Sequence, residues 1–199
     1  MTMTRKVTWD APASKRPRTN AYEIAKIKRV LGERKPEMKS QAYGAATETK
    51  LTGTVKVQEI TDIAAGDEAY ARDGLQIKIH RIFYTVTAYA NGTQNPVPGV
   101  DVFLITGKSD RVPAYTDFIS QIGGTINKNE YTTWKQHVIG GDNHGIVQDA
   151  HHFQYPMKVY FSSNASTSGL RNKTYIVVKN NTGVSVDVNI SSRLWFSDN

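Results

Sequence analysis

The sequence has no cysteine and no long apolar run. Disulfide bonds and thiolate metal sites are therefore excluded. No stretch of about 18 apolar residues occurs, so we predict no membrane-spanning helix. The N-terminus also lacks the apolar core of a secretory signal and carries Arg5 and Lys6 early in the chain, which argues against secretion.

Common motifs of catalytic sites are missing as well. The chain contains no Gly-x-Ser-x-Gly, no Gly-x-x-x-x-Gly-Lys-Ser/Thr and no Gly-x-Gly-x-x-Gly. We therefore predict that the protein is not an enzyme and needs no cofactor. The paired carboxylates of a glycoside hydrolase leave no short motif, so that chemistry stays open at this point.

Few residues of the chain suit a metal ion. His151 and His152 are adjacent, so in a strand their rings point to opposite faces of the sheet and chelate poorly. We interpret the acidic candidates as turn-forming or solvated loop residues, and we predict no metal site. These candidates are Asp62, Asp67 and Asp73 in one region, and Asp142, His144 and Asp149 in another.

The net charge of +7 is distributed very unevenly along the chain. Residues 1–39 hold 11 basic and 4 acidic side chains, whereas residues 40–199 hold 14 of each. The whole excess therefore lies in the first fifth of the chain. A cationic segment ahead of a neutral body favours a polyanion as its partner over a segment that is merely solvated.

The basic segment, residues 1–46, is predicted to be an arm ahead of a folded domain at 47–199. Residues 1–18 have few apolar side chains and are interrupted by two prolines, so we expect disorder there when the partner is absent. Residues 20–31 predict a short basic amphipathic helix, because apolar residues recur there at helical spacing. The arm is thus expected to be disordered or partly helical.

After the arm, the apolar pattern changes to a period of two, which is typical of strands with one buried face. Residues 184–196 show it most clearly, with branched apolar and phenylalanine side chains on one parity. The parity shifts by one near His80–Arg81, inside the run 75–90, which predicts a β-bulge. Residues 100–106 are apolar on both parities, as in a strand within a sandwich.

About eight such runs and the lack of a long helix predict an all-β fold, an eight-stranded antiparallel jelly-roll sandwich. The uneven connections favour this topology over a plain meander. Residues 153–161 are expected to alternate along one strand, and residues 112–122 to hold a helical turn. We interpret the aromatic side chains of the body as core and interface rather than as a platform for bases.

Several segments carry a resemblance to a known family. Lys15-Arg16-Pro17-Arg18 is similar to an arginine-rich arm, and Arg72-Asp73-Gly74 is similar to a turn into a long strand. Residues 102–105 and the ending 193–199 are similar to an inner and a final strand. Together they resemble the single jelly-roll coat proteins of small circular single-stranded DNA viruses, of the geminivirus and genomovirus type. The coat protein of satellite tobacco necrosis virus is a more distant likeness.

This resemblance implies a capsid protein that self-assembles into a T=1 icosahedral shell, with 60 copies, found in the virion and the host nucleus. Its partners would be further copies of itself, single-stranded nucleic acid with DNA favoured over RNA, and a host nuclear import receptor, but no membrane. Import would use Lys15, Arg16, Pro17 and Arg18. The nucleic-acid-binding residues would be Arg5, Lys6, Lys15, Arg16, Arg18, Lys26, Lys28, Arg29, Arg34 and Lys35.

Two other functions are compatible with the sequence. A carbohydrate-binding β-sandwich explains the body but gives the basic arm no task. A cellular single-stranded nucleic-acid-binding protein requires aromatic side chains on an exposed sheet face, and affinity that depends on the body. Loss of nucleic-acid binding on deletion of residues 1–39 would argue against this second alternative.

Overall fold

The computed structural model describes residues 37–51, 55–90, 99–119, 123–140 and 145–198. The chain divides into two units, Met1–Lys35 and Pro36–Asn199, and the second is called the body below. The strands of the body are β1 (Lys39–Leu51), β2 (Val55–Glu59), β3 (Gln76–Ala90), β4 (Val100–Gly107), β5 (Tyr131–Ile139), β6 (Ile146–Tyr160), β7 (Thr174–Asn180) and β8 (Val186–Asp198).

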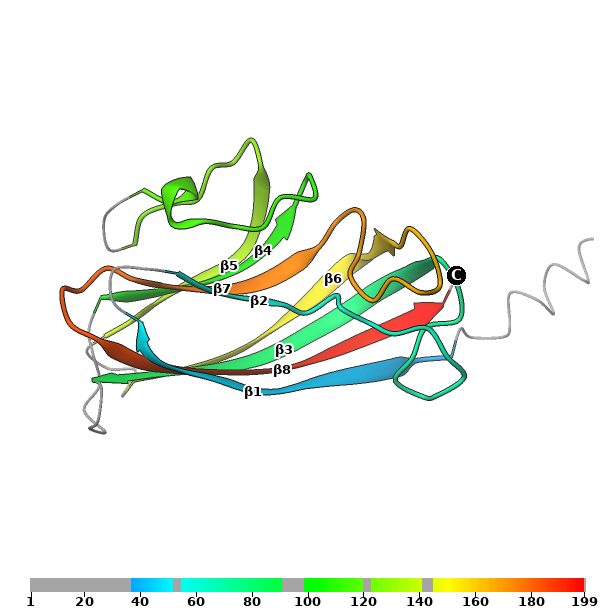
Figure 1. The fold of residues 1–199 in the computed structure, drawn as a ribbon, viewed down its shortest axis with the longest axis horizontal. Coiled ribbons are helices and arrows are strands. Elements are labelled where there is room, and N and C mark those ends of the chain that lie inside the picture. The colour runs from blue at the N-terminus through cyan, green and yellow to red at the C-terminus, as the bar shows by residue number, and fades with distance from the viewer. Residues whose placement is uncertain (1–36, 52–54, 91–98, 120–122, 141–144, 199) are drawn as a thin grey trace, which may run out of the picture. The chain divides into compact units, whose positions relative to one another are not determined.

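The strand order defines a jelly roll. One sheet has the order β1-β8-β3-β6 and the other the order β2-β7-β4-β5, and the two form the layers seen in Figure 1. Antiparallel pairs join β1 to β8, β2 to β7, β3 to β6 and β4 to β5. This is the pairing of one long hairpin rolled up so that its strands are shared between two sheets. The predicted eight-stranded jelly-roll sandwich is confirmed.

The main core lies between the two sheets and follows from the alternation of apolar side chains. In β8, five apolar side chains on one parity are fully buried, whereas their neighbours point outward. Burying apolar area in this way is the main force that holds the sheets together. The five side chains are Val186, Val188, Ile190, Leu194 and Phe196.

Strands β4 and β7 are buried along their whole length, because a loop covers the outer face of their sheet. The loop joins β4 to β5 and contains the 3-10 turn η1 (Tyr115–Asp117), so the helical turn predicted in 112–122 is confirmed (Figure 1). The ring of Phe118 from this loop packs against that of Phe103 of β4 in a tilted arrangement, with ring centroids 5.1 Å apart. A second, smaller apolar cluster therefore lies outside the sandwich.

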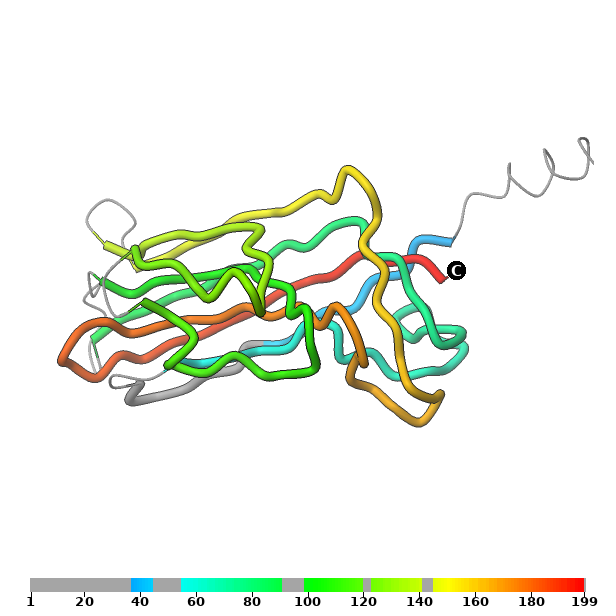
Figure 2. The backbone as a smooth tube through the Cα atoms, turned by 90° about the horizontal axis from the view of Figure 1, so that it is seen from above, coloured from blue at the N-terminus to red at the C-terminus, as the bar shows by residue number. Residues whose placement is uncertain are grey.

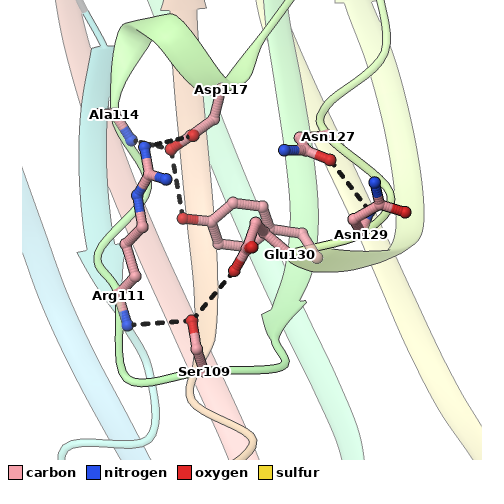
Figure 3. A network of polar contacts seen from close by, with 8 residues as sticks. Ser109, Arg111, Ala114, Asp117, Asn127, Asn129 and Glu130 are labelled. Atoms are coloured by element: carbon pink, nitrogen blue, oxygen red, sulfur yellow. Dashed lines mark hydrogen bonds and ion pairs between the residues drawn. The ribbon is translucent and has the colours of Figure 1, made fainter.

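A polar network fastens this loop (Figure 3). The buried carboxylate of Asp117 accepts hydrogen bonds from the Ala114 backbone N–H at 2.8 Å and from the Tyr131 hydroxyl at 3.3 Å. It also pairs with the Arg111 guanidinium at 2.6 Å. Burial, together with the nearby Asp117 charge, raises the pKa of Tyr131 to about 12. The hydroxyl therefore stays a hydrogen-bond donor at neutral pH.

The predicted bulge near His80–Arg81 is confirmed. On β6, Ile79 faces Met157 but Arg81 faces His152, and the same shift occurs against β8. The expected alternation over 153–161 holds at Phe153, Met157, Val159 and Phe161, which face the core. It fails at Tyr155, because one residue of β3 opposes four residues of β6 at this point. Tyr155 lies in the resulting bulge and is 80% exposed.

The first strand begins earlier than the arm prediction placed it. Residues 39–46, assigned to the arm, pair with β8 as the start of β1. Their mixed polar and small side chains lack an alternating apolar signal, because an edge strand is supported mainly by its single neighbour. The helix predicted at 20–31 lies outside the described residues.

Candidate functional site

The arm's predicted nucleic-acid-binding residues all lie between residues 5 and 35, outside the described residues. The same holds for the predicted import tract, Lys15–Arg18. Their roles stay predictions. The structure does show where the chain enters the body, which surfaces of the body are open, and how its loops are held.

The chain enters the body at an ionic anchor. Lys39, the first residue of β1, is 5% exposed, and its ammonium lies 2.8 Å from a carboxylate oxygen of both Asp73 and Asp198. Asp198 also accepts a hydrogen bond from the Asp73 backbone N–H at 3.0 Å. The anchor thus joins the start of β1, the β2–β3 loop and the end of β8.

The directions of the pKa shifts define the pH range over which this anchor stabilises the folded protein. Burial opposes the charge on Lys39, but its hydrogen bonds to Asp198 and Asp73 outweigh burial and raise its pKa. The hydrogen bond from Lys39 lowers the pKa of Asp73. The stabilisation from Asp73 is therefore complete above its unfolded pKa of about 4, and that from Lys39 is complete below about 10.

We expect an Asp73→Asn variant to melt at a lower temperature than the wild type between pH 6 and 8. The difference should shrink as the pH falls through the lowered pKa of Asp73, because protonation then removes the same charge from the wild type. Thermal unfolding followed by circular dichroism at pH 7 and pH 3 measures this. Asp67→Asn is the matched control, since Asp67 is exposed and forms no ion pair with a described residue. A pH-independent difference would contradict the anchor.

A buried arginine braces two loops at the same end of the body. Arg72 is fully buried, and its guanidinium donates to the backbone carbonyls of Ile63 at 3.1 Å and Ser163 at 2.8 Å, and to those of Gly74 and Ser166. It also lies 3.9 Å from the ring centroid of Phe161. Burial lowers the pKa of Arg72, partly offset by Asp198, but an arginine stays charged at neutral pH. Figure 2 shows the two loops, 60–75 and 161–173, together at this end.

The two sheets differ in what covers their outer faces. The β4–β5 loop covers the sheet β2-β7-β4-β5, whereas no described strand or helix lies on the outside of the sheet β1-β8-β3-β6 (Figure 1). We call this second surface the open face. Its outward side chains alternate with the buried ones and include Lys78, Arg81, Phe83, Lys158, Arg193 and Trp195.

The histidines and acids of the described body are held in separate contacts. His151 packs between Trp134 and Phe153, whereas His152 is exposed, so the two rings do point to opposite faces. His137 contacts the Asp149 carboxylate at 2.9 Å, and Lys135 pairs with the same group at 3.0 Å. No set of three or more His, Cys, Asp or Glu suited to a metal ion occurs in the described ranges. Asp142 and His144 lie outside them.

Three features of the body were missed by sequence reasoning: the Lys39 anchor, the Arg72 brace and the cationic open face. Arg72 was noted only as part of a turn, and Asp73 as part of the same turn and as a turn-forming acid. The anchor and the brace join residues far apart in the chain, so neither leaves a local pattern. The outward cations of the open face were visible on the strand parities, but their neighbours became known only with the strand order.

Comparisons with known proteins give structural likenesses only. No protein-family model matches the chain, and no curated protein matches it significantly. Among the known structures, a chain of Desmodium yellow mottle tymovirus is similar at 12% identity over 82% of this chain and 89% of that one, with a TM-score of 0.37. A chain of the full particle of Israeli acute paralysis virus is 13% identical over 98% and 83%, with a TM-score of 0.41.

A third likeness is to a chain of naturally occurring empty particles of cowpea mosaic virus. It is 10% identical over 78% of this chain and 84% of that one, with a TM-score of 0.31. Likenesses at these scores carry no conclusion about function. The assignment as a jelly roll stands on the strand order of the body itself. No described helix is long and apolar enough to cross a membrane.

Proposed function

We propose that this chain is a viral coat protein that self-assembles into a small icosahedral shell and packages single-stranded nucleic acid through its basic arm. The proposal rests mainly on how charge is distributed between the two parts of the chain. A jelly-roll body with as many acidic as basic side chains follows a segment that holds the entire excess of positive charge. The resemblance to geminivirus-type coats favours DNA over RNA and a shell of 60 copies.

The proposed mechanism is assembly rather than catalysis. Copies of the body pack side by side, and the arms neutralise phosphates by releasing the counterions that surround the nucleic acid. Such contacts position the nucleic acid without reading its sequence. The Lys39 anchor supports this mechanism, because it ties the first residue of β1 to two other segments and so couples the arm to the body.

Purified protein tests the proposal directly. Electron microscopy and light scattering should show closed particles when single-stranded nucleic acid is added to the protein at low salt. In a separate experiment, the nucleic acid that co-purifies with the particles should be digested by DNase after the shell is opened. Digestion by RNase alone would reverse the preference for DNA. A protein that stays monomeric at every salt concentration and pH, with nucleic acid present, would overturn the capsid proposal. A monomer that still binds single strands would support the cellular alternative.

The tract Lys15-Arg16-Pro17-Arg18 is proposed to bind a nuclear import receptor as well. Replacing Lys15, Arg16 and Arg18 by Ala should reduce the nuclear accumulation of a fused fluorescent reporter, because import receptors recognise such basic tracts by charge. A matched reporter with Lys56, Lys108 and Lys128 replaced should accumulate normally. Equal accumulation of both variants would count against import through this tract.

A further inference from the structure

The open face has two arrangements of like charge that form no ion pair with any described residue. Lys78 of β3 and Lys158 of β6 are direct cross-strand neighbours. Both point outward, because each alternates with side chains that face the core. Like charges in this position destabilise a sheet unless an anion lies near them. Neither lysine forms an ion pair with a described residue.

A second pair of cations lies farther along the same face. The register places Arg81 opposite Trp195 and Phe83 opposite Arg193. The guanidinium carbons of Arg81 and Arg193 lie 4.9 Å and 6.0 Å from the centroid of the Trp195 ring. Neither arginine has an acidic partner among the residues with determined positions. Two guanidinium groups therefore share one aromatic ring.

These residues line a shallow groove of about 570 Å³. The groove also contains Ser191 and Ala42 at its sides. One polar atom of a lining residue, the Arg81 Nε, is buried without a hydrogen-bond partner in the described part of the chain. A buried donor without a partner costs about 1–3 kcal/mol. The groove thus combines the hydrogen-bond donors and positive charge of two guanidinium groups with the flat aromatic rings of Trp195 and Phe83.

From this geometry we infer that the open face binds a single strand of nucleic acid, with phosphates at the cations and bases stacked on Trp195, Phe83 and the Arg193 guanidinium. Stacking on aromatic rings and guanidinium planes within a cationic groove is how proteins hold unpaired strands without reading sequence. The inference deepens the proposed function and rests on it, since it assigns to the body a second contact with the packaged strand.

Charge decides between the possible occupants of the open face. The basic segment of this chain would bring an excess of positive charge to a surface that is already cationic. A second copy docked through the same face about a two-fold axis would place cations opposite cations. Asp187 is the one acidic side chain that points outward from the described residues of β3 and β8, and it lies six positions from Arg193. A polyanion is the occupant that this distribution fits.

The first test measures affinity with the full chain. Arg81→Gln/Arg193→Gln is compared with the wild type in binding fluorescein-labelled (dT)20, followed by anisotropy at several salt concentrations. We expect about tenfold weaker binding near 0.15 M salt, and a salt slope smaller by about 1.4, because each phosphate contact on a single strand contributes about 0.7. The matched control is Lys108→Gln/Lys128→Gln, which removes two exposed cations from the loop on the other sheet. The control should bind within twofold of the wild type.

A second variant separates bases from phosphates. Trp195→Leu should weaken binding of (dT)20 about fivefold but leave binding of inorganic polyphosphate unchanged, because only the oligonucleotide has bases to stack. Circular dichroism shows whether each variant is folded. Equal losses for both probes would mean that the face attracts any polyanion, and that result would overturn the assignment to nucleic acid.

Cross-linking locates the contact without any variant. Ultraviolet irradiation of the wild-type complex with (dT)20, followed by trypsin and mass spectrometry, should label peptide 194–199, which contains Trp195. Labels confined to residues before 39, with Arg81→Gln/Arg193→Gln binding normally, would overturn the inference and leave the proposed function intact. If the 194–199 peptide is labelled but no particles form, the capsid proposal is rejected, whereas the inference that the open face binds single strands is retained. Loss of particles by the double variant with unchanged (dT)20 affinity would make the face an interface between copies and overturn the inference.

Discussion

Replacing Arg72 by Met is expected to destabilise the body by about 4 kcal/mol. The variant removes the donors for four backbone carbonyls, in the β2–β3 and β6–β7 loops, and each buried acceptor left without a partner costs about 1–3 kcal/mol. Methionine keeps much of the apolar contact with Phe161, so the loss is chiefly that of the hydrogen bonds. A loss of this size lowers the melting temperature of a domain of this length by about 10 °C.

Urea and thermal unfolding followed by circular dichroism measure the effect of Arg72→Met. Arg72→Lys should recover only part of the stability. An ammonium has three donors on a single nitrogen, so it cannot reach four carbonyls that lie around a planar guanidinium. Arg171→Met is the matched control, since Arg171 is exposed on the β6–β7 loop. A melting temperature for Arg72→Met within 2 °C of the wild type would show that the two loops do not depend on the brace.

Replacing all ten basic residues between Arg5 and Lys35 by Gln is expected to empty the particles. If each of these cations meets one phosphate of a single strand, the salt slope of binding falls by about 7. A change of that size alters the affinity by several orders of magnitude between low and physiological salt. Because the body as a whole has no excess charge, its open face adds far fewer phosphate contacts than the ten cations of the arm.

The ratio of absorbance at 260 and 280 nm of purified particles measures the packaged nucleic acid, which should fall at least tenfold in the Gln variant. The matched control is an arm with the same composition in shuffled order, because phosphate contacts tolerate changes of sequence. The shuffled arm should package nearly as much as the wild type. If the Gln variant packages as much nucleic acid as the wild type, the body alone is sufficient for packaging, which contradicts the proposed role of the arm.

The two predictions have different origins. Every cation of the arm is visible in the sequence, and counterion release depends on number and density of charge more than on shape, so their effect can be estimated without coordinates. The importance of Arg72 depends on four carbonyls from distant parts of the chain. In the sequence Arg72 is simply one of 25 basic residues.

Local periodicity of apolar residues predicted some features of this protein and missed others. It located the buried face of β8 and the bulge at His80–Arg81, because a strand with one buried face must alternate and a bulge must shift that alternation. It misread Tyr155 within the run 153–161, because four residues of β6 leave the register there and this side chain is exposed. It also missed the start of β1 at Lys39, whose position is held by pairing with β8 and by Asp73 and Asp198.

By itself, the sequence determined the class of the fold, the strand faces and the concentration of charge ahead of the body, since these depend on composition and short-range spacing. Only the tertiary structure decided which strands are neighbours. That order places Lys78 beside Lys158, and Arg81 and Arg193 beside Trp195. It also leaves one sheet covered and the other open. The physical reason is that strand pairing is a long-range choice, made by the burial of the whole core rather than by any one segment.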